Sequence, residues 1–204
     1  DIPHELRNEL EIVAPTLWSE LSAKASQWVA PAKKRLEREL RGYPKTFNDP
    51  VWGDIVLFPW ETLLLDCPLL QRLRGVRQLG MAHLVYPGAC HDRLEHSRGV
   101  VEAAERMIRS LERNGEFRRT FGKDKDVSVP LVCPHDRYTI RLAALLHDIG
   151  HGAFSHATEQ LISMRLHAEF KAAAVALRKV FSGVTSIAPG EIVAAILILS
   201  EPLK

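Results

Sequence analysis

The sequence contains few cysteines, no long apolar run and no strong excess of one charge. Its three cysteines, Cys67, Cys90 and Cys133, are widely spaced, which suits neither a disulfide framework nor a cysteine-rich zinc site. The apolar run from Ile192 to Leu199 is far shorter than the roughly 20 residues of a membrane-spanning helix. With 27 basic and 25 acidic residues, bulk charge does not indicate a nucleic-acid partner. We therefore expect a cytoplasmic globular protein without a transmembrane segment or a signal peptide.

The spacing of apolar residues and turn formers predicts an all-α, mainly helical fold with a small β-hairpin near residues 47–58. Loops are expected over 80–92 and 114–136, where glycine and proline recur. The periodic segments predict helices over 15–41 with a break at Pro31, and over 60–66, 68–79, 93–113, 137–149, 157–181 and 189–200. The positions predicted to be buried in the first and fifth of these helices are Leu17, Leu21, Trp28, Leu36, Leu40, Ile140, Ala143, Ala144, Leu145 and Leu146.

The string from Leu145 to His156 contains the most informative chemistry. Imidazole and carboxylate groups follow an apolar helix there, and their burial without partners would be costly. His147 and Asp148 are adjacent, so they can hold one ion near the helix end only with a ligand from another element. His96, in the first turns of a separate helix, is the natural candidate. This donor set suits Mn²⁺, Fe²⁺, Zn²⁺ or Ni²⁺ and also allows Mg²⁺.

Histidines gather around this string and around His96. Five of the nine lie in two short segments that adjoin glycines: His91, His96, His147, His151 and His156. The alternative for any single histidine is a hydrogen-bonded structural residue or a helix cap, but the combination favours a metal or phosphate site. Glu159 follows His156 at the spacing that lets a carboxylate orient an imidazole, and such a pair can supply a proton. The alternative for this pair is a solvated surface position.

Three stretches give the chain a resemblance to a known family, over roughly residues 49–167. They run from Gln71 to Gly80, from Val85 to Val100 and from His147 to His156. In their order and spacing they resemble the HD-domain deoxynucleoside triphosphate triphosphohydrolases. The resemblance implies a helical HD-domain fold and an enzyme that hydrolyses dNTPs.

The same resemblance implies roles for individual residues. His96, His147 and Asp148 would bind a divalent metal ion together with a later aspartate, and Arg93 and His151 would contact the phosphates. The identity of the metal, Mn, Fe, Mg, Zn or Ni, stays open.

Further roles implied by the resemblance concern the sugar and proton transfer. Gln78 with Leu79 would face the deoxyribose, and His156 with Glu159 would form an acid or orienting pair. His167 is similar to a further active-site histidine of the family. The expected partners are a nucleotide substrate, first a dNTP, and copies of the same chain in a homo-oligomer.

One departure from the family pattern is that no aspartate follows Asp148. Either the chain stops short of the last metal ligand or a glutamate such as Glu191 replaces it, and we expect truncation. The expected organisation is thus an N-terminal helical segment, residues 1–46, and an HD phosphohydrolase domain, residues 47–204, truncated at its C-terminus.

Three functions remain open from the sequence. The first is metal-assisted hydrolysis of a dNTP to deoxynucleoside and triphosphate. The second keeps the site but changes the substrate to another nucleotide or a nucleic-acid end. The third is a nucleotide-sensing regulatory module with little turnover, which the missing metal ligand favours.

Overall fold

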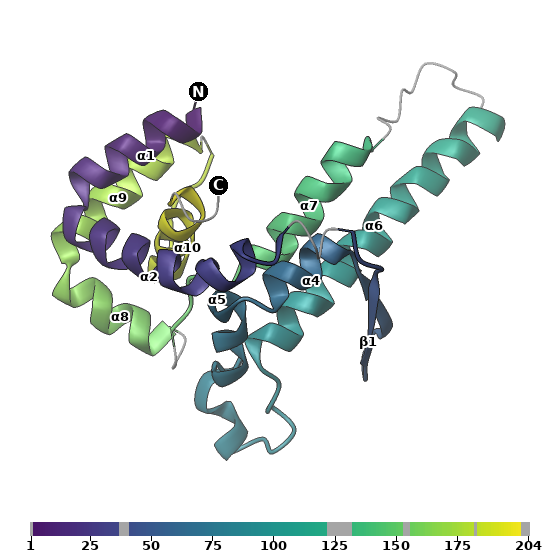
Figure 1. The fold of residues 1–204 in the computed structure, drawn as a ribbon, viewed down its shortest axis with the longest axis horizontal. Helices are drawn as coiled ribbons and strands as arrows, with labels where there is room; N and C mark the ends of the chain where they lie inside the picture. Colours follow the sequence, from purple (N-terminus) through teal and green to yellow (C-terminus); the bar gives the residue numbers. More distant parts are fainter. Residues whose placement is uncertain (1, 37–40, 122–131, 153–155, 182, 201–204) are drawn as a thin grey trace.

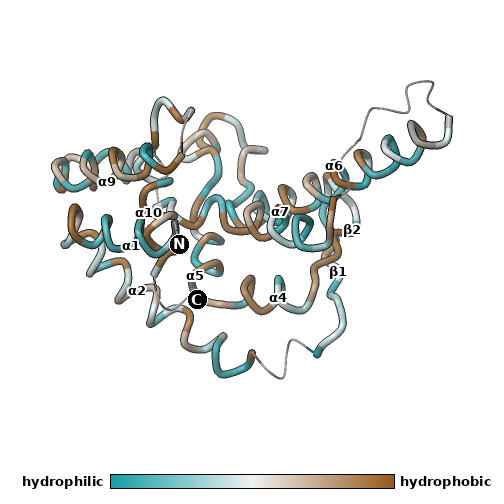
Figure 2. The backbone as a smooth tube through the Cα atoms, turned by 90° about the horizontal axis from the view of Figure 1, so that it is seen from above, coloured by the Kyte–Doolittle hydropathy of each residue, from teal (hydrophilic) through white to brown (hydrophobic). Residues whose placement is uncertain are grey.

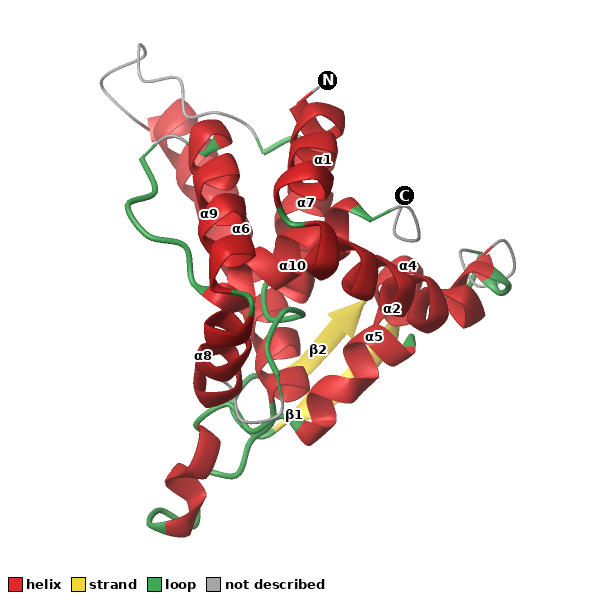
Figure 3. Ribbon diagram, turned by 90° about the vertical axis from the view of Figure 1, so that its left-hand side faces the viewer, coloured by secondary structure: helices red, strands yellow, loops and turns green. Residues whose placement is uncertain are grey.

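Helices account for most of the regular structure, and one two-stranded hairpin accompanies them (Figures 1 and 3). The structure is a computed structural model, and it describes residues 2–36, 41–121, 132–152, 156–181 and 183–200. Its α-helices are α1 (Ile2–Val13), α2 (Pro15–Lys33), α4 (Pro59–Leu65), α5 (Pro68–Gln71), α6 (Arg93–Phe121), α7 (Pro134–Leu146), α8 (His156–Arg165), α9 (His167–Val180) and α10 (Pro189–Leu199). Two 3₁₀ helices, η1 (Arg72–Gly75) and η2 (Gly80–Leu84), and the strands β1 (Lys45–Asp49) and β2 (Gly53–Leu57) complete the described elements. The expected all-α fold with a small hairpin is confirmed.

The hairpin forms where turn residues interrupt a β-prone run. Its strands pair antiparallel, with Lys45 opposite Leu57 and Asp49 opposite Gly53. Asp49 Oδ1 accepts hydrogen bonds from the backbone nitrogens of Val51 and Trp52, which closes the turn. Gly53 has φ 75°, a left-handed conformation that glycine adopts without steric cost.

Several helix boundaries differ from the sequence prediction because tertiary contacts override local pattern. The helix predicted over 68–79 stops at Gly75, and Arg77 then forms an antiparallel bridge with Asp92. Pro31 does not break α2, which continues to Lys33. The predicted loop over 114–136 is helical as far as Phe121, and its residues 122–131 lie outside the described part.

Two further differences concern the C-terminal half and the buried positions. The single helix predicted over 157–181 is interrupted at Leu166, between α8 and α9. Of the positions predicted to be buried, Leu36, Ile140 and Ala143 are exposed, whereas the others that the structure describes are buried or partly buried. Leu40 lies outside the described residues. The inward face of α7 instead includes Arg141, so its buried stripe is rotated from the one that apolarity alone predicts.

Arg141 joins β2, α4, α6 and α7 through a buried ion cluster. Its guanidinium donates to both carboxylate oxygens of Glu61 at 2.7 Å and to Glu105 Oε2 at 3.0 Å. It also donates to the carbonyl oxygen of Val56 at 3.0 Å and lies over the ring of Phe58. Glu61 is 0% exposed and Arg141 2% exposed, so each charge depends on the other for its solvation.

The hydrophobic core consists of two clusters that meet on α10. One cluster joins α1 and the start of α2 to α9, and it includes Ile192 and Ile196 of α10. The other joins the hairpin, α4 to α7 and the end of α2, and it includes Ala194 and Leu197 of α10. Along α6 and α9, hydrophilic and hydrophobic residues alternate as amphipathic packing requires (Figure 2).

The N-terminal helices pack onto the C-terminal half of the chain. α1 lies beside α9, and α2 contacts both α5 and α10 (Figure 1). The boundary at residue 46 therefore stays a prediction. Within the described residues, no helix combines the length and apolar character needed to cross a membrane.

Candidate metal centre

The structure brings together three side chains from two segments, with His96 51 residues before His147 and with Asp148 next to His147. His96 lies in the first turns of α6, and His147 and Asp148 directly follow α7, which packs against α6. One ligand atom from each of these residues lies within 4.8 Å of the other two. The two Nε2 atoms of His96 and His147 are 3.3 Å apart, and His147 Nε2 lies 3.3 Å from Asp148 Oδ1.

These distances fit a shared divalent ion. Two ligands about 2.1 Å from one ion lie roughly 3.0 to 3.5 Å apart when they subtend right or tetrahedral angles. His147 Nδ1 lies 2.8 Å from the carbonyl oxygen of Ala144, so Nδ1 carries the proton and Nε2 keeps its lone pair for a metal. Burial lowers the pKa of His96 more than the nearby Asp148 raises it, which favours the neutral ring that a metal needs.

Asp148 is held as a carboxylate by its neighbours. Arg93 Nη1 donates to Asp148 Oδ2 at 2.7 Å, and both side chains are almost entirely buried. Burial alone would raise the pKa of Asp148, but the hydrogen bond from His151 and the charge of Arg93 lower it well below its usual range. The group is therefore ionised at any pH at which a metal would bind.

His151 bridges two carboxylates behind the three ligands. Its Nε2 lies 3.2 Å from Asp148 Oδ1, and its Nδ1 is hydrogen-bonded to Glu159 Oε1. Burial would lower the pKa of His151, but the bonds to Asp148 and Glu159 raise it above its ordinary value. His156 begins α8, but its side chain lies outside the described part of the chain, so its pairing with Glu159 stays a prediction.

A close contact with α10 sets the position of the turn that carries Asp148 and His151. A Cβ atom at Gly150 would overlap the carbonyl oxygen of Gly190 and lie 2.6 Å from the backbone nitrogen of Ala194. A Cβ at Gly190 would lie 3.1 Å from the ring of His151. Position 150 therefore requires glycine, because only then do the backbones of the turn and the helix meet. A side chain at position 190 would require the ring of His151 to shift by a few tenths of an ångström.

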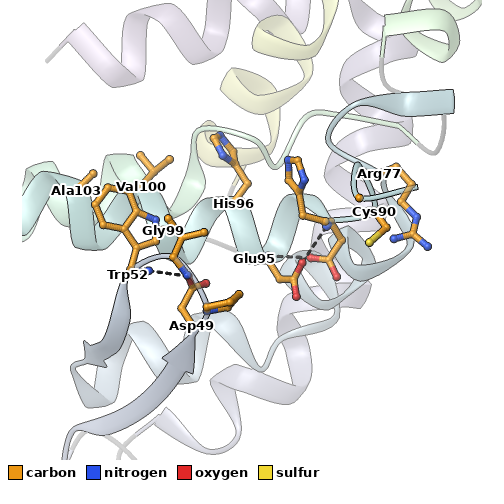
Figure 4. Close-up of a pocket in the computed structure, with 14 residues that line it drawn as sticks. Asp49, Trp52, Arg77, Cys90, Glu95, His96, Gly99, Val100 and Ala103 are labelled. Atoms are coloured by element: carbon orange, nitrogen blue, oxygen red, sulfur yellow. Dashed lines mark hydrogen bonds between the residues drawn. The ribbon is translucent and has the colours of Figure 1, made fainter. Parts of the chain in front are cut away.

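A cleft of about 680 Å³ opens on one side of His96. Along it, His96 lies between Trp52 and Arg77 (Figure 4). Trp52 can approach α6 closely because residue 99 is glycine; a Cβ atom added there would lie 2.7 Å from the indole nitrogen. The cleft offers space for a substrate beside His96.

The sugar-contacting residues implied by the resemblance do not line this cleft. The backbone nitrogen of Gln78 donates to the carbonyl oxygen of His91 at 3.2 Å, which places Gln78 beside the segment that leads into α6. Its Oε1 is buried without a hydrogen-bond partner among the described residues, and Leu79 is 53% exposed. A substrate hydroxyl could donate a hydrogen bond to this buried oxygen.

Two other candidates lie apart from the three ligands. His167 begins α9 on an exposed surface, and among the described residues no hydrogen bond or ion pair joins it to them. Glu191 begins α10, where its Oε2 accepts a hydrogen bond from the backbone nitrogen of Ala188 at 2.7 Å. Within the described residues the ligand group contains three members, and Glu191 is not one of them.

Sequence reasoning missed Arg72 as a contributor to the site. Its Nη1 donates to the carbonyl oxygen of His151 at 2.7 Å, and its Nη2 donates to the carbonyl oxygen of Ile149. The sequence contains one indication of this role, because Arg72 lies in the stretch from Gln71 to Gly80 that carries the family resemblance. Only the fold shows which backbone atoms Arg72 contacts.

Comparison with known proteins is consistent with this geometry. Over 113 residues the chain is 41% identical to the deoxynucleoside triphosphate triphosphohydrolase SAMHD1 of Danio rerio, which covers 55% of this chain and 16% of that protein. It is 39% identical over 112 residues to the Homo sapiens protein of the same name, covering 55% of this chain and 16% of that protein. The chain thus spans less than a fifth of the length of these two relatives.

A solved structure and a family match complete the comparison. A hypothetical protein from Aquifex aeolicus is 34% identical, with a TM-score of 0.45, and the match covers 67% of this chain and 31% of that chain. At that TM-score the likeness carries no argument. The family described as "HD domain" matches residues 93–202, which include all three proposed ligands. Because this match covers more than half of the 204 residues, the chain belongs to the HD-domain family.

Proposed function

We propose that the protein is a metal-dependent phosphohydrolase acting on nucleotides, and that its first substrate class is the dNTPs, cleaved to deoxynucleoside and triphosphate. The observation that carries the proposal is the convergence of His96, His147 and Asp148 within 4.8 Å. The names of the relatives support the substrate class, since the animal proteins are called deoxynucleoside triphosphate triphosphohydrolases.

Each residue of the site has a role in this proposal. A bound divalent ion supplies Lewis-acid polarisation of a phosphoryl oxygen and a water of lowered pKa. Arg93 places a fixed positive charge beside Asp148, where it can offset the negative charge that develops on the phosphate. His151, whose raised pKa favours the protonated ring, shares its ring protons with Asp148 and Glu159 and would give up the proton on Nε2 to the departing 5′ oxygen.

The other residues assigned from the resemblance keep proposed roles. Gln78 and Leu79 would discriminate the sugar, and His156 would assist proton transfer with Glu159. His167 would join the site only if substrate or a further segment brought it closer.

The test is product analysis with dNTPs and Mn²⁺. Deoxynucleoside and inorganic triphosphate in equal amounts support the proposal. Orthophosphate or a nucleoside monophosphate would instead indicate a different scissile bond or substrate. Asp148→Asn, which preserves the shape of the side chain and removes its charge, is the matched control and should form no product.

A second function is favoured by the composition of the ligand group. Among the described residues only three ligands converge, and the carboxylate of Glu191 caps α10. A nucleotide-sensing module must bind its nucleotide, but it does not need a complete catalytic site. Nucleotide binding at a saturating concentration of Mn²⁺, with no product, would select this function.

The proposed setting is a reducing, cytoplasmic compartment, with a homo-oligomer as the proposed assembly. The three cysteines, Cys67, Cys90 and Cys133, are free. Burial raises the pKa of the Cys67 thiol, which keeps it protonated and inert.

A further inference from the structure

Arg72 is a partly buried cation that forms no ion pair with any carboxylate of the described residues. Its two terminal nitrogens donate to the backbone carbonyl oxygens of His151 and Ile149, on either side of Gly150. The described residues offer it no ion-pair partner, and its Nε is buried without a hydrogen bond. Burial disfavours the charged form of Arg72 and lowers its pKa, so the few groups that contact the guanidinium must stabilise its charge.

The remaining contact of Arg72 comes from the N-terminal helices. Its guanidinium carbon lies 5.4 Å from the ring centroid of Trp28, within the range of a cation–π interaction. Trp28 belongs to α2, which packs against α5 just before Arg72 and against α10. Trp28 and Arg72 also line one cavity of about 300 Å³ together with His151 and Glu159, on the inner side of the metal-binding turn.

These contacts form a chain from α2 to the candidate metal ligand. Trp28 supports the guanidinium, the guanidinium holds the two carbonyls, and the carbonyls belong to the turn that starts at Asp148. Ile149 and His151 flank the glycine that meets α10, so the turn is restrained from two sides. A planar fork with two parallel donors fixes both the distance and the direction of this turn, which a lysine ammonium cannot do.

We propose that Arg72 and Trp28 are positioning residues, which hold the turn at residues 148–151 in the conformation that binds the divalent ion. The inference rests on the proposed metal site, and it gives the N-terminal segment a part in it. Trp28 and Arg72 both lie outside residues 93–202, the part matched by the family.

The experiment compares four proteins with the wild type: Arg72→Met, Arg72→Lys, Trp28→Ala and Arg106→Met. The last is the matched control, because Arg106 also lies over a tryptophan, at 5.1 Å from Trp52, and also donates to a backbone carbonyl oxygen. Thermal denaturation first establishes that each variant is folded at the temperature of the titration. Calorimetry with Mn²⁺ then gives the dissociation constant, and the visible spectrum of bound Co²⁺ reports the ligand geometry.

Arg72→Met should weaken Mn²⁺ binding about 10- to 100-fold, the usual effect of removing a group that orients a ligand. Trp28→Ala should weaken it roughly 2- to 30-fold, the range of a cation–π contact. Arg72→Lys should fall between Arg72→Met and the wild type, and Arg106→Met should match the wild type. The Co²⁺ spectrum should change in Arg72→Met, which loss of overall stability alone would not cause.

Hydrogen–deuterium exchange of the metal-free proteins provides a readout that needs no metal. The amides of residues 147–152 should exchange faster in Arg72→Met and Trp28→Ala than in the wild type and in Arg106→Met. If the wild type binds no Mn²⁺, the proposed metal site fails, while these exchange rates still decide the positioning role. If Arg72→Met does not fold, Arg72→Lys and Trp28→Ala carry the comparison. Unchanged Mn²⁺ affinity and unchanged exchange in the folded variants would overturn the inference.

Discussion

Replacing Gly150 by alanine probes the packing of the turn at residues 148–151, which carries the proposed metal ligand Asp148, against α10. The new Cβ would overlap the carbonyl oxygen of Gly190 and would lie 2.6 Å from the backbone nitrogen of Ala194, whereas ordinary contact begins at 3.4 Å. The turn or α10 must therefore shift by about 0.8 Å or more. Both obstacles are backbone atoms of one helix, so no side-chain rotation can remove the clash.

The expected magnitude is at the upper end of the overpacking range. The free energy of unfolding of Gly150→Ala should fall by about 3 kcal/mol, which lowers the Tm by roughly 6 to 12 °C in a chain of this size. Because Asp148 lies two residues earlier in the same turn, Mn²⁺ affinity should fall by at least about 10-fold. Differential scanning calorimetry and Mn²⁺ titration measure the two effects.

Gly75→Ala is the matched control, because a Cβ at Gly75 meets no atom within 4 Å. It adds the same methyl group to a glycine of the 3₁₀ helix η1, and both Tm and Mn²⁺ affinity should stay near those of the wild type. If Gly150→Ala and Gly75→Ala behave alike in both assays, the turn has room that the structure does not show, and the reasoning is refuted.

Four other predictions concern the site and the buried ion cluster. Asp148→Asn should lose bound Mn²⁺ and all hydrolysis, and metal content equal to that of the wild type would contradict its role as a ligand. Arg141→Met should lower the free energy of unfolding by about 3 to 5 kcal/mol, since it leaves the buried carboxylate of Glu61 without its counter-ion and removes one of the arginines that pair with Glu105. Urea denaturation measures this, and a loss below about 1 kcal/mol would contradict it. Glu191→Gln, which keeps an acceptor for the α10 cap, should leave Mn²⁺ affinity unchanged, and weaker binding would show that Glu191 reaches the ion. Gln78→Ala should alter the ratio of activities on deoxy and ribo substrates with little loss of metal, and a constant ratio would argue against its contact with the sugar.

Features set by local chemistry were predictable from the sequence. The hairpin follows from turn residues between β-prone segments, and two of the candidate metal ligands follow from the position of His147 and Asp148 at the end of an apolar helix. The third candidate ligand, His96, could be named only because it adjoins charged residues at the start of another predicted helix. These predictions depend only on residues that are close to one another in the sequence.

Features that depend on distant backbone atoms could not be predicted in this way. The sequence around Arg72 does not show its role, because its hydrogen bonds run to carbonyls 77 and 79 residues away. The buried face of α7 includes Arg141 because Glu61 and Glu105 pair with it from other helices. The periodicity of apolar residues along α7 does not indicate these distant partners. The end of the predicted helix over 68–79 likewise depends on the bridge to Asp92.

The sharing of α10 between both core clusters has a consequence for how the protein melts. Neither half can lose its packing without exposing one side of this helix, so heating should produce a single cooperative transition, with equal calorimetric and van't Hoff enthalpies. Gly190 of the same helix touches the metal-binding turn. An ion bound at that turn should therefore raise the midpoint of the whole transition, and the N-terminal helices, far from the ion along the chain, should melt later as well.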